Sequence, residues 1–128
     1  MTHAIGTFEV KLAPLATDVP TASRMSIDKQ FHGDLEATSK GEMLSVMTEV
    51  KGSAGYVAME RVTGSLHGRS GSFVLQHNAT MNRGAPQLSV TVVPDSGTGA
   101  LAGLSGKMAI IIEAGKHSYE FEYVLPAA

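Results

Sequence analysis

Apolar and polar residues alternate through most of this chain, and short stretches containing glycine or proline separate the alternating segments. Alternation with a period of two is typical of a β-strand that buries one face. The last segment shows it clearly, since HSYEFEYVL places aromatic side chains on one face and glutamates on the other. The pattern predicts eight strands, at residues 4–12, 24–36, 42–50, 55–65, 70–79, 87–93, 107–113 and 117–125.

The connections between these segments are short, and no segment has a helical period longer than the single turn expected at 100–104. We therefore predict an all-β fold with essentially no helix, in one domain spanning residues 1–128. An eight-stranded antiparallel barrel is favoured over a sandwich because closure removes exposed strand edges. The glycine-rich stretch at 97–103 lacks the spacing and the following helix of a phosphate-binding loop, so it is expected to be a tight structural loop.

Composition excludes several classes of function. The chain has no cysteine, which rules out disulfides, zinc–thiolate sites and thiol nucleophiles. Its net charge is −2 with scattered basic residues, which argues against nucleic-acid binding. No apolar run reaches the length of about 20 residues that a membrane helix needs. The N-terminus lacks the pattern of a signal peptide, so a cytoplasmic location is expected. The five histidines show no close ligand spacing, and neither a metal nor a cofactor is predicted.

The densest set of reactive side chains lies in the predicted hairpin at 54–78. Parity turns Tyr56, Glu60 and His77 toward the interior, and these are the candidate catalytic residues. A dry, unpaired Glu60 would have a raised pKa and could act as a general acid or base. If Ala58 pairs with Leu75, Tyr56 falls opposite His77, and a slip of one residue would place Gln76 there instead.

Lys29 interrupts the apolar face of the segment at 24–36. Its amine could extend to a barrel end and remain in water. Alternatively it is buried beside a carboxylate, because an unpaired buried charge is too costly. The alternative to a catalytic role for Glu60 is a structural ion pair, with Lys29 as the obvious inward-facing partner or with Arg61 on a neighbouring rim.

Three hypotheses for function remain open. The first is the binding of a small apolar or amphipathic molecule inside the barrel. The second is an isomerase, cyclase or lyase that moves a proton with Glu60. The third is a structural barrel filled by its own side chains. Segments 42–50 and 107–113 are apolar on both faces, which predicts a homo-oligomer. The residues expected to contact a ligand are Lys29, Phe31, Phe73, Leu75, Gln76, Tyr119, Phe121 and Tyr123.

Three stretches in order, ERVTGSLHGRSGSFVLQ, VVPDSGTGALAGLSG and HSYEFEYVLP, resemble the bacterial family of unknown function numbered 3224. The resemblance extends from about Phe8 to Pro126. The family resembles the allene oxide cyclase barrel in fold, which implies an eight-stranded antiparallel barrel and an oligomer. The resemblance implies no activity, and none of the cyclase's functional residues is placed on this chain by a motif.

Overall fold

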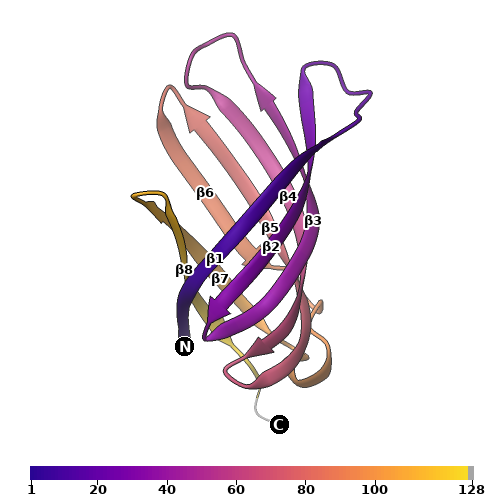
Figure 1. Ribbon diagram of the computed structural model, residues 1–128, viewed down its shortest axis with the longest axis vertical. Coiled ribbons are helices and arrows are strands. Elements are labelled where there is room, and N and C mark those ends of the chain that lie inside the picture. Colours follow the sequence, from indigo (N-terminus) through magenta and orange to yellow (C-terminus); the bar gives the residue numbers. More distant parts are fainter. Residues whose placement is uncertain (127–128) are drawn as a thin grey trace.

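The computed structural model describes residues 1–126 and consists of eight antiparallel strands that close into a barrel in chain order (Figure 1). This confirms the predicted fold. A single 3-10 turn, η1, spans Gly99–Leu101, and no helix in the described residues is long and apolar enough to cross a membrane. The strands are β1 (Thr2–Leu15), β2 (Ala22–Gly33), β3 (Leu35–Met47), β4 (Ala54–Leu66), β5 (Arg69–Asn82), β6 (Ala85–Val92), β7 (Ser105–Glu113) and β8 (Lys116–Val124).

The turn between β2 and β3 does not lie where the sequence suggested. The chain reverses at Gly33 and Asp34, and residues 38–41, which lie between the predicted strands 24–36 and 42–50, are part of β3. Gly33 has a φ of 107°, which glycine adopts without a steric penalty. The last paired residues are Phe31 and Ala37, and the odd number of residues between them, five, keeps the alternation in phase, so no break is visible in the sequence. Gly41 is a strand residue whose lack of a side chain admits the neighbouring backbone, because a Cβ there would lie 2.0 Å from the Met59 carbonyl oxygen.

The hairpin of β4 and β5 has the predicted parity with a different register. Ala58 pairs with His77 and not with Leu75, the pairing considered from the sequence, so Glu60 lies opposite Leu75. The turn consists of His67 and Gly68 alone, with φ values of 47° and 81°. Two consecutive residues with positive φ form the tight turn that the twist of a hairpin favours. The register therefore shifts by two residues, and every side chain stays on its predicted face.

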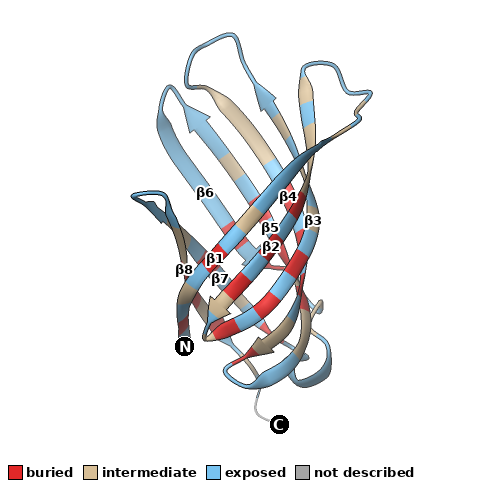
Figure 2. Ribbon diagram, viewed as in Figure 1, coloured by how far each residue is buried: buried red, intermediate tan, exposed pale blue. Residues whose placement is uncertain are grey.

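One end of the barrel is filled and closed. Buried residues concentrate in the half nearest the chain termini (Figure 2). Leu101 and Leu104 of the long β6–β7 connection plug this end, and Thr98 of the same connection donates a backbone hydrogen bond to the Ser72 carbonyl. The glycine-rich stretch at 97–103 therefore belongs to the plug, as expected of a structural loop. The Tyr119 hydroxyl adds a link across the end by accepting from the Leu35 amide at 2.9 Å.

The opposite end is open. Side chains with inward parity remain exposed to solvent there, whereas the same faces are buried deeper in the barrel. The inward apolar residues that remain exposed are Leu12, Met47, Met81, Leu88 and Ile112. In Figure 2 this end is exposed along most strands. The barrel is thus half core and half open mouth.

Candidate functional site

A cluster of polar side chains is buried where the packed core meets the open mouth. Glu60 is 1% exposed, and its Oε1 accepts hydrogen bonds from Lys29 Nζ at 3.1 Å and from His77 Nε2 at 3.2 Å. Its Oε2 accepts from Ser39 Oγ at 3.1 Å. The four side chains come from β2, β3, β4 and β5, and the described residues contain no buried side-chain polar atom without a partner. The barrel wall therefore encloses a polar network in which each buried side-chain polar atom has a partner.

The charges of the network keep Glu60 ionised. Burial alone would raise the pKa of Glu60, but the hydrogen bond from His77 and the positive charge of Lys29 outweigh it, so the pKa lies below its ordinary value. A carboxylate only accepts, so the His77 Nε2 atom that faces it carries the proton. A raised pKa is expected only for an unpaired Glu60. The side chain is instead paired with Lys29, which is the alternative of a structural ion pair.

Lys29 is a buried amine rather than one that reaches water at a barrel end. It is 7% exposed, and its ammonium lies 5.0 Å from the Phe8 ring centre and 5.7 Å from that of Phe31. Aromatic faces attract a desolvated cation. Together with Glu60 they compensate for the loss of water, which explains how a lysine occupies an apolar face.

Tyr56 lies beside this network on the side of the open mouth. Its ring centre is 6.3 Å from that of His77, and it is only partly buried. Burial raises the pKa of Tyr56, and the negative charge of Glu60 raises it further. The phenol therefore stays neutral and presents a hydroxyl that can donate or accept a hydrogen bond.

A pocket of about 390 Å³ occupies the mouth above Tyr56. Most of its lining residues have inward parity, and most of them are apolar. Its lining is Ser45, Ala54, Gly55, Tyr56, Ala79, Thr80, Met81, Pro86, Gln87, Leu88 and Ile112. This volume lies within the range of small-molecule sites, about 300–1,000 Å³.

The structure separates the predicted ligand contacts into groups. Tyr56 alone among the predicted site residues lines the mouth pocket. Lys29, Glu60 and His77 lie together beneath it in the buried network. The remaining inward-facing residues pack into the core of the closed half, and they are Phe31, Phe73, Leu75, Tyr119, Phe121 and Tyr123.

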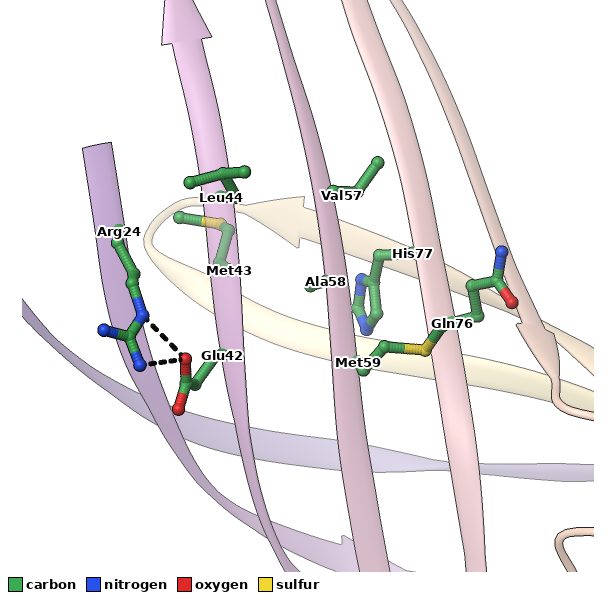
Figure 3. A pocket seen from close by; sticks show the side chains of 9 residues that line it. All are labelled: Arg24, Glu42, Met43, Leu44, Val57, Ala58, Met59, Gln76 and His77. Carbon is green, nitrogen blue, oxygen red and sulfur yellow. Dashed lines mark hydrogen bonds and ion pairs between the residues drawn. The ribbon is translucent and has the colours of Figure 1, made fainter. Parts of the chain in front are cut away.

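Gln76 faces the outside of the barrel, so it does not line the interior. It pairs with Met59, and both line a separate pocket of about 360 Å³ on the outer face of the wall. Figure 3 shows this pocket with the Arg24–Glu42 ion pair at one end, at 2.7 Å, and Gln76 toward the other. The one-residue slip that would have turned Gln76 inward does not occur.

Sequence reasoning missed Ser39 and most of the mouth. Ser39 lies between the predicted strands 24–36 and 42–50, so the prediction gives it no inward face. The mouth residues Ala54, Ala79, Met81, Leu88 and Ile112 extend the inward rows whose central members were recognised. Extending the alternating pattern to the end of each strand would have identified these residues as inward-facing. Their exposure to solvent could not be predicted in this way, because it depends on how far the packed core extends along the barrel.

The arrangement suits binding better than proton transfer. Glu60 is ionised, accepts from three donors and is 1% exposed, and it does not line the mouth pocket. Among residues 1–126, no three histidine, cysteine or acidic side chains are grouped to hold a metal ion. The open mouth offers a mostly apolar wall that includes Tyr56.

Comparisons with known proteins give a family without an assigned activity. The family model described as protein of unknown function, DUF3224, matches residues 4–123. A crystal structure of a protein with unknown function from the DUF3224 family of Shewanella oneidensis MR-1 is 56% identical. The match covers 100% of this chain and 99% of that chain with a TM-score of 0.93. No curated protein matches the chain. The chain therefore belongs to the DUF3224 family.

Proposed function

We propose that this protein binds a small apolar or amphipathic molecule in the open mouth of the barrel. The observation that carries the proposal is the mouth pocket itself, which places apolar side chains of inward parity around about 390 Å³ of space. Exposing such a surface to water is unfavourable, and a contiguous apolar patch on a monomer commonly marks a binding site.

The exposed side chains of the rim support the same proposal. Ile112 is 64% exposed, and Leu88 is 44% exposed, although both lie on inward-facing rows that are buried further down. Each would transfer apolar area out of water when a ligand covers it, at roughly 25 cal/mol per Å². Tyr56 at the base of the pocket would orient one polar group of the ligand through its neutral hydroxyl.

The buried network acts in this proposal as a floor. Lys29, Glu60 and His77 satisfy one another and end the apolar core below the mouth. They form a polar layer next to Tyr56, whose ring centre lies 6.3 Å from that of His77. An isomerase or cyclase role for Glu60 is less well supported, since a lowered pKa makes it a weak base and leaves it without a proton to donate.

The neutral fluorescent probe N-phenyl-1-naphthylamine tests the proposal. We expect its emission to rise on binding to the wild-type protein and to reach saturation. Ala79→Phe fills the mouth, and Leu88→Glu places a charge in it, so both should weaken binding by at least about tenfold, or 1.4 kcal/mol. Leu88 lies on the exposed rim, so Leu88→Glu is the variant less disruptive to folding.

Asn78→Phe is the matched control, because Asn78 neighbours Ala79 on β5 with its side chain exposed on the outer face. It should bind the probe as the wild type does. A wild-type protein that does not bind the probe, or variants Ala79→Phe and Leu88→Glu that bind it with unchanged affinity while retaining their β-sheet circular dichroism, would refute the proposal.

A further inference from the structure

The wall of the barrel is incomplete at one seam. β6 and β7 pair through Thr91 and Lys107 alone, whereas β5 and β6 pair over eight residue pairs and β7 and β8 over nine. Within the described chain, residues 85–90 of β6 and 108–113 of β7 therefore have no ladder partner across this seam. In Figure 1 the tip of β6 diverges from the β7–β8 hairpin toward the open end.

The sequence of β6 suits an unpaired edge. Pro86 lies in this strand and has no amide hydrogen to give to a ladder, and proline within sheets is confined to edges, strand starts and bulges. On its other side β6 is paired with β5 from Leu75–Val92 to Asn82–Ala85. The backbone N–H and C=O groups that would complete the β6–β7 ladder are thus available at the seam to hydrogen-bond with another molecule.

A pocket of about 380 Å³ lies along the seam and neighbours the mouth pocket. It is lined by Leu88, Ser89, Val90, Thr91, Lys107, Met108, Ala109, Glu120 and Glu122. Leu88 lines both pockets. The mouth pocket and the seam pocket therefore lie on either side of one residue of β6.

The two pockets differ in chemistry. The mouth is apolar, whereas the outer part of the seam presents hydroxyl groups together with charges of both signs. Lys107 Nζ lies 3.8 Å from Glu122 Oε2, so part of this charge is internally balanced. The carboxylates of Glu120 and Glu122 outnumber the amine of Lys107, so the seam disfavours an anionic ligand group. The free backbone groups favour a ligand group that both donates and accepts hydrogen bonds.

We propose that the ligand is an elongated amphiphile whose apolar body lies in the mouth and whose uncharged, hydrogen-bonding polar end leaves through the seam between β6 and β7. This inference rests on the proposed binding function and adds the class of the ligand and its path. The seam serves as a second part of the site, where the polar end bonds to the unpaired backbone of the two strands.

Closing the seam with a disulfide tests the inference, and the chain has no cysteine of its own to interfere. Ser89→Cys with Ala109→Cys continues the Thr91–Lys107 register by two residues, and both positions are exposed. Mass spectrometry confirms the bond. We expect the oxidised protein to bind 1-monodecanoylglycerol at least about tenfold more weakly than the reduced protein, while the compact probe N-phenyl-1-naphthylamine binds both forms equally.

A control disulfide is placed where the wall is already complete. Thr38→Cys with Thr63→Cys joins two exposed residues that pair across β3 and β4, and it should leave both affinities unchanged. If the seam disulfide does not form, Ser89→Trp with Ala109→Trp fills the seam without a covalent bond, and the same selective loss is expected.

The outcomes separate the two proposals. Suppose that the protein binds the probe, but that sealing or filling the seam does not change its affinity for 1-monodecanoylglycerol. This result would overturn the inference and leave the binding function standing. A wild-type protein that binds the probe but not 1-monodecanoylglycerol would also overturn it. A wild-type protein that binds neither would refute the binding function itself.

Discussion

Lys29 and Glu60 lie 31 residues apart in the chain and form an ion pair inside the barrel, with 3.1 Å between Nζ and Oε1. Their side chains are 7% and 0% exposed, so water contributes little to stabilising either charge. Each group depends on the other and on the neighbouring Ser39, His77 and aromatic rings. The pair marks the level at which the packed core gives way to the open mouth.

Removing one charge of this pair should destabilise the barrel. Glu60→Gln leaves the Lys29 ammonium buried without a counter-charge, and we expect the free energy of unfolding to fall by about 3–5 kcal/mol. Lys29→Met with Glu60→Leu removes both charges and should recover most of that loss.

Urea unfolding followed by circular dichroism measures the stability of both variants. Glu9→Gln, at a side chain 79% exposed, is the control and should change stability by less than about 0.5 kcal/mol. A Glu60→Gln protein as stable as the control would contradict the importance of the pair.

Acid should remove the contribution of Glu60 in a defined direction. Its pKa is lowered in the folded state, so its contribution is fully present above the ordinary value of 4.5 and is lost as pH falls through the folded-state pKa. The stability advantage of the wild type over Glu60→Gln should therefore shrink as pH falls below 4.5. Urea titrations of both proteins at a series of pH values measure it. An advantage that stays constant down to the acid-unfolding limit would show that Glu60 is not the titrating group.

Gly41 should tolerate no side chain. A Cβ at Gly41 would lie 2.0 Å from the Met59 carbonyl oxygen, and backbone there cannot move without breaking the β3–β4 ladder. Gly41→Ala should lower the free energy of unfolding by about 1–3 kcal/mol or more. Gly55→Ala is the matched control in β4, since its Cβ would meet only one atom, at 3.7 Å. Thermal unfolding measures the stability of both variants, and equal stability of Gly41→Ala and Gly55→Ala would contradict this expectation.

The hydroxyl of Tyr119 should matter more than that of Tyr123. Tyr119 accepts from the buried Leu35 amide at 2.9 Å and donates to the His32 carbonyl at 3.0 Å. Tyr119→Phe leaves that amide without a partner, at a cost of about 1–3 kcal/mol. Tyr123 bonds to a partly exposed His67, so Tyr123→Phe should cost less. Chemical denaturation measures the difference, and an equal loss in both variants would go against it.

Local pattern was enough to predict much of the wall. Alternation identified eight strands and placed Glu60, Tyr56 and His77 on inward faces, because a side-chain period of two depends only on neighbours in the sequence. It failed at the β2–β3 turn, where Gly33 and Asp34 reverse the chain without changing phase. It also misread Gly41, whose missing side chain serves an adjacent strand rather than a turn.

The sequence by itself determined the strand count, the face of each side chain and the presence of a lysine and a glutamate on inward rows. Only the tertiary structure decided that this lysine and this glutamate meet. The pairing of Lys29 with Glu60 depends on the registers of β2, β3 and β4, and a shift of two residues leaves the pattern unchanged while moving every contact. The same holds for the open mouth and the seam at Thr91 and Lys107, because the extent of closure is a property of the whole barrel.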